Sequence, residues 1–223
     1  MNSSIFSEPI IVLDFETTGL YPDEGDRAIE IGAVLLRGNE ITERFSSLIN
    51  PGFWVPREIE NITGITNTML EGAPPVDEVM EKFVKFIDTH PLVAHNASFD
   101  QKFLEAELGH FGKKRPLNFA CTLQVAKRLY PDVINYKLET LVRYKGIPVD
   151  DQFHRALADA EMAAALWGEM AEDLKSQFGF EHVTFELMKK IGKMSRENAH
   201  ALILKEAEAT KSNQVDTTGN LFG

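Results

Sequence analysis

The chain has 223 residues, of which 43% are hydrophobic and 26% charged, and this composition is that of an ordinary globular domain with an appendage. Its net charge of −11 argues against a broad basic face that wraps duplex nucleic acid, and its single cysteine, Cys121, excludes an intramolecular disulfide. No apolar run approaches the length of a membrane span, so we expect a cytoplasmic protein with no membrane partner.

The first predicted element is a strand over residues 10–13 that ends in carboxylates. Its run of aliphatic residues, bounded by polar ones, is typical of a central strand buried on both faces. Because side chains alternate along a strand, Asp14 and Glu16 project to the same side. Two like charges at the edge of an apolar sheet repel each other and lose hydration, and a hard divalent metal relieves both costs. The alternative is a polar strand end that lies in solvent.

Strands and helices are expected to follow in mixed order. Residues 28–36 and 40–49 read as two strands that meet at Gly38-Asn39, a hairpin-like turn pair. Further on, periodicity and turn residues predict short helical pieces in 56–70, a helix over 76–88, a strand at 91–94, a helix over 98–109, a strand at 118–121, helices at 122–130 and 136–144, and a long helix toward residue 178.

Two more acidic residues stand at the start of predicted helices. Asp100 falls in the first turn after the strand at 91–94, and Asp159 lies on the apolar stripe of the long helix, which turns its carboxylate toward the core. A buried Asp needs a partner. Arg155, one turn earlier, and a shared metal are the two candidates. His154 cannot face the same side of a helix as Asp159, so we place it in the preceding loop.

Three segments that carry these residues resemble the motifs of a known enzyme family. Asp14-Phe15-Glu16-Thr17-Thr18-Gly19, His95-Asn96-Ala97-Ser98-Phe99-Asp100 and His154-Arg155-Ala156-Leu157-Ala158-Asp159 look like the three exonuclease motifs of the DnaQ-like, DEDDh 3′→5′ exonucleases. The epsilon proofreading subunit of DNA polymerase III and ribonuclease T belong to that family, and the resemblance covers about residues 8–177. It implies a ribonuclease H-like α/β fold, a five-stranded mixed sheet with helices on both faces.

The resemblance also implies a role for each site residue. Two Mg²⁺ or Mn²⁺ ions would be bound by Asp14, Glu16, Asp100 and Asp159, and His154 would be the general base. The terminal nucleotide would be held by Thr17, Thr18, Gly19, Leu20, Ile62, Thr63, Asn96 and Phe99. Thr63 departs from the epsilon subunit, which has His there, and Phe99 fits a core position equally well.

We therefore expect a metal-dependent 3′→5′ exonuclease that releases nucleoside 5′-monophosphates from single-stranded or frayed 3′ ends of DNA. Two alternatives stay open. One is an exoribonuclease that trims RNA 3′ ends. The other is a proofreading or accessory subunit, bound to a polymerase or sliding clamp through residues 179–223.

The rest of the chain is expected to form an extension of the exonuclease domain at residues 1–178. Within residues 179–223 we predict a short amphipathic helix at 195–205 and a mobile tail from 210, whose Gln214 and Leu221-Phe222 resemble clamp-docking peptides. Basic clusters at 113–115, 127–128 and 143–145 either steer a strand end or are solvated surface.

Overall fold

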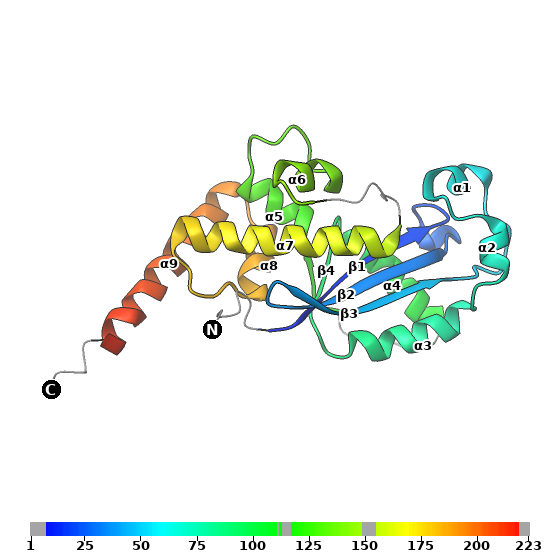
Figure 1. Cartoon of the computed structure of the whole chain (residues 1–223), viewed down its shortest axis with the longest axis horizontal. Helices are drawn as coiled ribbons and strands as arrows, with labels where there is room; N and C mark the ends of the chain where they lie inside the picture. The colour runs from blue at the N-terminus through cyan, green and yellow to red at the C-terminus, as the bar shows by residue number, and fades with distance from the viewer. Residues whose placement is uncertain (1–7, 111, 113–116, 149–154, 219–223) are drawn as a thin grey trace.

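The structure, a computed structural model, describes residues 8–110, 112, 117–148 and 155–218 and contains a five-stranded mixed sheet (Figure 1). The strand order is β3-β2-β1-β4-β5. β1 pairs antiparallel with β2 and parallel with β4, which makes the sheet mixed. The ribonuclease H-like prediction is confirmed. The strands are β1 (Ile10–Thr17), β2 (Ala28–Arg37), β3 (Glu40–Leu48), β4 (Leu92–Ala94) and β5 (Phe119–Cys121).

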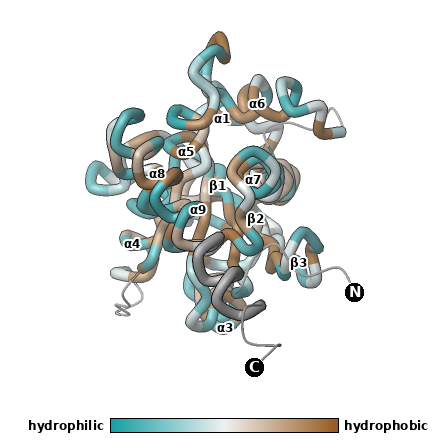
Figure 2. The backbone as a smooth tube through the Cα atoms, turned by 90° about the vertical axis from the view of Figure 1, so that its left-hand side faces the viewer, coloured by the Kyte–Doolittle hydropathy of each residue, from teal (hydrophilic) through white to brown (hydrophobic). Residues whose placement is uncertain are grey.

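Helices cover both faces of the sheet, as Figures 1 and 2 show with α7 on one side of β1 and β2 and α3 on the other. Alternation along β1 explains the two layers. Ile11 and Leu13 join the apolar cluster of α3 (Val76–Ile87) and α4 (Ser98–His110). Ile10 and Val12 join the cluster of α5 (Thr122–Leu129), α7 (Ala156–Phe178) and α8 (Phe185–Lys193). The remaining helices are η1 (Pro22–Glu24), α1 (Arg57–Thr63), α2 (Asn67–Glu71), α6 (Leu138–Tyr144) and α9 (Arg196–Thr218).

The first turn of α7 lies against β2 at Gly32. A Cβ atom at Gly32 would stand 2.1 Å from the backbone nitrogen of Leu157, so the contact needs a residue without a side chain. Gly32 is paired with Asp14 across β1 and β2. The start of α7 is therefore fixed beside the acidic end of β1.

The region after residue 178 differs from the sequence prediction. Helix α8 was not predicted, and α9 continues to Thr218, through residues predicted to be a mobile tail. Polar composition argued against order there, but the Ala, Glu and Lys residues of this segment are good helix formers. Ala199, Ile203 and Ala207 are buried in the same cluster as α7. The domain boundary at 178 stays a prediction, and Leu221-Phe222 lies outside the described residues.

Within the ranges that the structure describes, none of the helices is both long enough and apolar enough to cross a membrane.

Replacing Phe185 by Ala tests whether α8 belongs to the folded core. Phe185 is 1% exposed and its ring centroid lies 6.3 Å from that of Trp167. Phe185→Ala should lower the free energy of unfolding by about 3–5 kcal/mol, measured by urea titration. The control Leu204→Ala removes a side chain that is 44% exposed and should cost less than about 0.5 kcal/mol. Equal effects would show that α8 does not stabilise the core.

Candidate active site

Three carboxylates meet at the C-terminal end of β1. Asp14 and Glu16 leave the strand on the face covered by α7, and Asp159 comes from the first turn of that helix. One ligand atom from each of the three residues lies within 4.8 Å of the other two. All three residues are half-buried, so these charges are only partly hydrated. The structure thus brings together two segments that are far apart in the sequence.

Asp100 enters the same region from the first turn of α4. Only 1% of the residue is exposed, and its Oδ1 accepts the backbone N–H of Phe15 at 3.2 Å. Its Oδ2 is buried and has no hydrogen-bond partner among the residues that the structure describes. A buried oxygen in this condition costs free energy unless a cation or a proton reaches it.

The concentration of negative charge raises the pKa of these groups. Burial is the main cause at Asp14, whose pKa lies well above its usual range, and the neighbouring Asp100 and Asp159 raise it further. Burial also raises the pKa of Glu16 to about 7 and that of Asp100 to about 8. A hard divalent cation would stabilise the charged forms. The orphaned oxygen of Asp100 and the three convergent carboxylates therefore fit a divalent metal site.

An ion pair to the buried Glu30 ties the start of α7 to the sheet. Arg155, which precedes the helix, donates from Nη2 to Oε1 of Glu30 at 2.7 Å and from Nε to both Glu30 oxygens at 3.2 Å. Glu30 is 2% exposed, and it also accepts the backbone N–H of Ala156 at 3.0 Å. Since Glu30 is paired with Glu16 across the strands, the contact places α7 and β1 relative to each other.

The sequence predicts no role for Glu30, and it leaves Arg155 and a shared metal as the two candidate partners of Asp159. The guanidinium bonds to Glu30 in the structure. One signal could have revealed this, because Glu30 is the only acidic residue in the otherwise apolar run at 28–36. An acidic residue in such a strand is buried and must have a partner.

The carboxylate of Asp26 holds the loop after β1. Its Oδ1 accepts the hydroxyl of Thr18 at 3.2 Å, and its Oδ2 accepts the backbone N–H of Tyr21 at 2.9 Å. A Cβ atom at Gly19 would lie 2.3 Å from Asp26 Oδ2. A side chain at Gly19 would displace the Asp26 carboxylate from these two bonds, so glycine allows Asp26 to hold the loop beside the acidic site.

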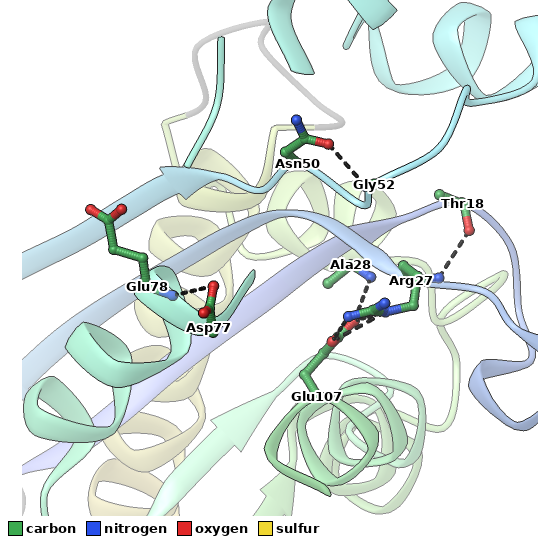
Figure 3. A network of polar contacts seen from close by, with 8 residues as sticks. All are labelled: Thr18, Arg27, Ala28, Asn50, Gly52, Asp77, Glu78 and Glu107. Atoms are coloured by element: carbon green, nitrogen blue, oxygen red, sulfur yellow. Dashed lines mark hydrogen bonds and ion pairs between the residues drawn. The ribbon is translucent and has the colours of Figure 1, made fainter. Parts of the chain in front are cut away.

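Figure 3 shows how this loop is joined to α4. The backbone nitrogen of Arg27 donates to Thr18 Oγ1 at 3.0 Å, and its guanidinium pairs with Glu107 at 2.7 Å. Glu107 is 1% exposed and also accepts the backbone N–H of Ala28 at 3.0 Å. Buried glutamates thus fix β2 to two helices, to α4 through Glu107 and to α7 through Glu30.

His95 fixes a second segment beside the site. Its Nε2 lies 3.0 Å from the carbonyl oxygen of Tyr136, and its Nδ1 lies 2.8 Å from Thr122 Oγ1. A carbonyl only accepts, so Nε2 carries the proton and Nδ1 accepts the Thr122 hydroxyl. Burial lowers the pKa of His95 to about 4, so its ring is neutral at physiological pH.

The residues predicted to hold the terminal nucleotide fall into two groups. The first borders the loop after β1 and the end of α1. Leu20 and Ile62 are large apolar residues that are 61% and 59% exposed. The Thr17 hydroxyl donates to the Gly19 carbonyl at 2.6 Å. Thr63 is buried, and its hydroxyl donates to the Ile59 carbonyl at the end of α1.

The second group stands at the start of α4. Asn96 has a left-handed backbone with φ 64° and lines a cleft of about 760 Å³ together with Asp14 and Asp159. Phe99 packs against the ring of Phe103, with centroids 4.9 Å apart, and so contributes to the core. His154, the predicted general base, lies outside the described residues.

Comparison with known proteins places this geometry in a family. The profile described as "Exonuclease" matches residues 11–167. The DNA polymerase III subunit epsilon of Aquifex aeolicus is 33% identical over 180 residues, which cover 80% of this chain and 88% of that protein. The chain belongs to the exonuclease family. Its predicted resemblance to the DnaQ-like exonucleases is confirmed.

Another relative is much longer than this chain, and two similar structures were solved with DNA or with a nucleotide. The PolC-type DNA polymerase III of Clostridium perfringens is 36% identical over 178 residues, and this chain spans only 12% of its length. Exonuclease X, solved in complex with 5′ overhanging duplex DNA, is 26% identical with a TM-score of 0.64, covering 82% of this chain and 99% of that one. A DEDDh nuclease domain bound to rAMP, 22% identical with a TM-score of 0.63, covers 74% of this chain and 92% of its own and supports the fold alone.

Removing the buried carboxylate of Glu30 should weaken the metal site. Glu30→Ala frees the start of α7 from β2, and we expect the affinity for Mn²⁺, measured by calorimetry, to fall by about 10- to 100-fold. Arg44→Ala is the matched control. Arg44 Nε lies 2.6 Å from Oε1 of Glu161, and this ion pair also joins the sheet to α7. Its side chains, unlike that of Glu30, are well exposed, at 53% and 36%. The control should retain the affinity of the unchanged protein. Equal losses would refute a positioning role for Glu30.

Protons and metal should compete for the acidic site. Because the folded-state pKa values of Glu16 and Asp100, about 7 and about 8, exceed their ordinary values, the metal-free folded state binds more protons than the unfolded state. Its stability should therefore fall as pH rises from about 6.5 to about 8.5, a window above the titration of His95. Mg²⁺ removes this loss, so the rise in melting temperature on adding Mg²⁺ should be larger at the higher pH.

Thermal melts in EDTA and in Mg²⁺ measure this difference. Asp100→Asn removes one of the titrating groups, so its metal-free melting temperature should change less with pH than that of the unchanged protein. The same Mg²⁺ effect at both ends of the window would contradict a site that protons and metal share.

Proposed function

We propose that this protein is a metal-dependent 3′→5′ exonuclease that releases nucleoside 5′-monophosphates from single-stranded or frayed 3′ ends of DNA. The observation that carries the proposal is the convergence of Asp14, Glu16 and Asp159 within 4.8 Å, next to the buried Asp100. Its relatives include a subunit of DNA polymerase III and an exonuclease solved with DNA, which favours DNA over RNA as the substrate.

The proposed chemistry is hydrolysis at a phosphodiester held by the acidic site. Two divalent ions, Mg²⁺ or Mn²⁺, would supply positive charge to the scissile phosphate and lower the pKa of the attacking water when bound. Asp14, Glu16, Asp100 and Asp159 would hold them. His154 would accept the proton of the water, a task that suits an imidazole whose ordinary pKa is near neutrality.

The terminal nucleotide would lie on the side of the site formed by Leu20 and Ile62. Both side chains are exposed, at 61% and 59%, and offer apolar surface for a base or a sugar. The neighbouring Thr17, Thr18 and Thr63 hydroxyls are bonded within the protein, which keeps these two segments in place. These threonines would then contribute to nucleotide binding through their backbone atoms and by keeping the neighbouring Leu20 and Ile62 in position.

A second candidate function is that of a proofreading or accessory subunit. The similarity to the Aquifex aeolicus epsilon subunit favours it. The C-terminal end of α9, which runs away from the sheet in Figure 1, is the natural place for contact with a polymerase or a clamp. Deleting residues 208–223 leaves the buried Ala199, Ile203 and Ala207 of α9 in place. A self-sufficient nuclease would keep its activity after this deletion, whereas a subunit would lose its partner.

Loss of a metal-binding carboxylate should abolish turnover. The assay is a Mn²⁺-supported time course on matched DNA and RNA oligonucleotides labelled at the 5′ end. We expect a ladder that shortens from the 3′ end, faster on DNA, which Asp14→Ala and Asp159→Ala both reduce to the level of an EDTA control. Glu43→Ala removes an exposed carboxylate of β3 and should leave the rate unchanged. Wild-type rates in either aspartate variant would refute the assignment, and faster RNA cleavage would favour the exoribonuclease alternative.

A further inference from the structure

The cleft beside the carboxylates is also lined by positive charge. Asp14, Asp159 and Asn96 line it at the acidic site. Lys127, from the last turn of α5, and Lys137, the residue before α6, line the same cleft. The cleft therefore joins the proposed metal site to two ammonium groups in a chain whose net charge is −11.

Both lysines are available for an external anion. Each residue is exposed, and neither makes an ion pair with a carboxylate in the part of the chain that the structure describes. Glu139 also lines the cleft, but its Oε1 lies 3.2 Å from Nη2 of Arg143, so its negative charge is offset. Several other lysines do have carboxylate partners, namely Lys82, Lys85, Lys145 and Lys189.

Hydrogen bonds to buried groups hold the segment around Tyr136 and Lys137 in place. The carbonyl of Tyr136 is bonded to the buried side of His95, and the Tyr136 hydroxyl donates to the Tyr130 carbonyl at 2.9 Å. The ring of Tyr136 also lines the cleft, and Lys127 Nζ lies 5.9 Å from its centroid. Together with Leu123 it adds an apolar surface to the charged one.

We propose that this lysine wall, formed by Lys127 and Lys137, binds the phosphodiesters of a single-stranded polynucleotide on the 5′ side of the scissile bond. The proposal rests on the proposed function and adds the path of the strand. In this proposal the terminal nucleotide contacts Leu20 and Ile62, and the rest of the strand enters the cleft that Asn96 and both lysines line. A volume of about 760 Å³ accommodates one or two nucleotides but no duplex.

The chemistry of the wall also defines its selectivity. Ammonium groups contact phosphates as point charges and read no base sequence. The Tyr136 ring offers a stacking face that accepts any base. We therefore expect binding that is independent of sequence, sensitive to salt and selective for single strands.

The first test measures binding without turnover. Fluorescence anisotropy of a labelled single-stranded oligothymidylate is followed in Mg²⁺ on an Asp14→Ala background, which prevents hydrolysis. Lys127→Gln and Lys137→Gln should each weaken binding by about tenfold at low salt and reduce the slope of log K against log salt by about 0.7. Lys175→Gln, in the last turn of α7 at the far end from Asp159, removes the same charge and should change neither quantity.

A second test separates the lysine wall from the catalytic site. The p-nitrophenyl ester of thymidine 5′-monophosphate has no nucleotide on the 5′ side, so the lysine variants should hydrolyse it with wild-type kcat/KM while their KM for the oligonucleotide rises. Equal losses of kcat/KM on both substrates, or unchanged oligonucleotide binding, would refute the binding role proposed for the lysine wall. Intact, lysine-dependent binding with no turnover of either substrate by the unmodified protein would instead overturn the proposed function.

Discussion

Mutual repulsion among carboxylates at the end of β1 is the constraint on which this structure depends. Ligand atoms of Asp14, Glu16 and Asp159 lie within 4.8 Å of one another. Burial and the neighbouring carboxylates raise the pKa of Asp14 and of Glu16, so the arrangement opposes folding in the absence of a cation. Such a site persists only where the surrounding structure holds it. The rest of the fold supplies that support from the sheet and from two helices.

The support consists of buried contacts that join helix starts to strands. Glu30 accepts from Arg155 and Ala156 and so fixes the first turn of α7. Asp100 accepts the backbone N–H of Phe15, which places the start of α4 against β1. Each contact restrains backbone as well as side chain, so the carboxylates have little freedom to separate. The acidic site is thereby organised before any metal arrives, which reduces the entropy lost on binding.

Local patterns were sufficient to predict the elements that carry the site. The apolar run before Asp14, the capping pattern before Asp100 and the stripe around Asp159 predicted β1, α4 and α7 within a few residues. The five-stranded mixed sheet was implied by the family resemblance. The partner of Arg155 and the two bonds of His95 depend on contacts between distant segments, as in the 125 residues that separate Glu30 from Arg155. The cleft that Lys127 and Lys137 share with Asp14 and Asp159 depends on such contacts too. Periodicity carries no information about such pairs. The length of helix α9 was underestimated for another reason. A segment of polar helix formers resembles a disordered tail in composition.

Gly32 is important for the acidic site although it takes no part in the chemistry there. A methyl group there would meet the backbone of Ala156 and Leu157, at 2.2 Å and 2.1 Å, and would push the whole of α7 outward from β2. Asp159 would move with the helix. A saturation mutagenesis screen scored on nuclease activity would therefore rank Gly32 beside the carboxylates, although it has no functional group to offer. Such a screen would identify the residues that position the carboxylates as well as the carboxylates themselves.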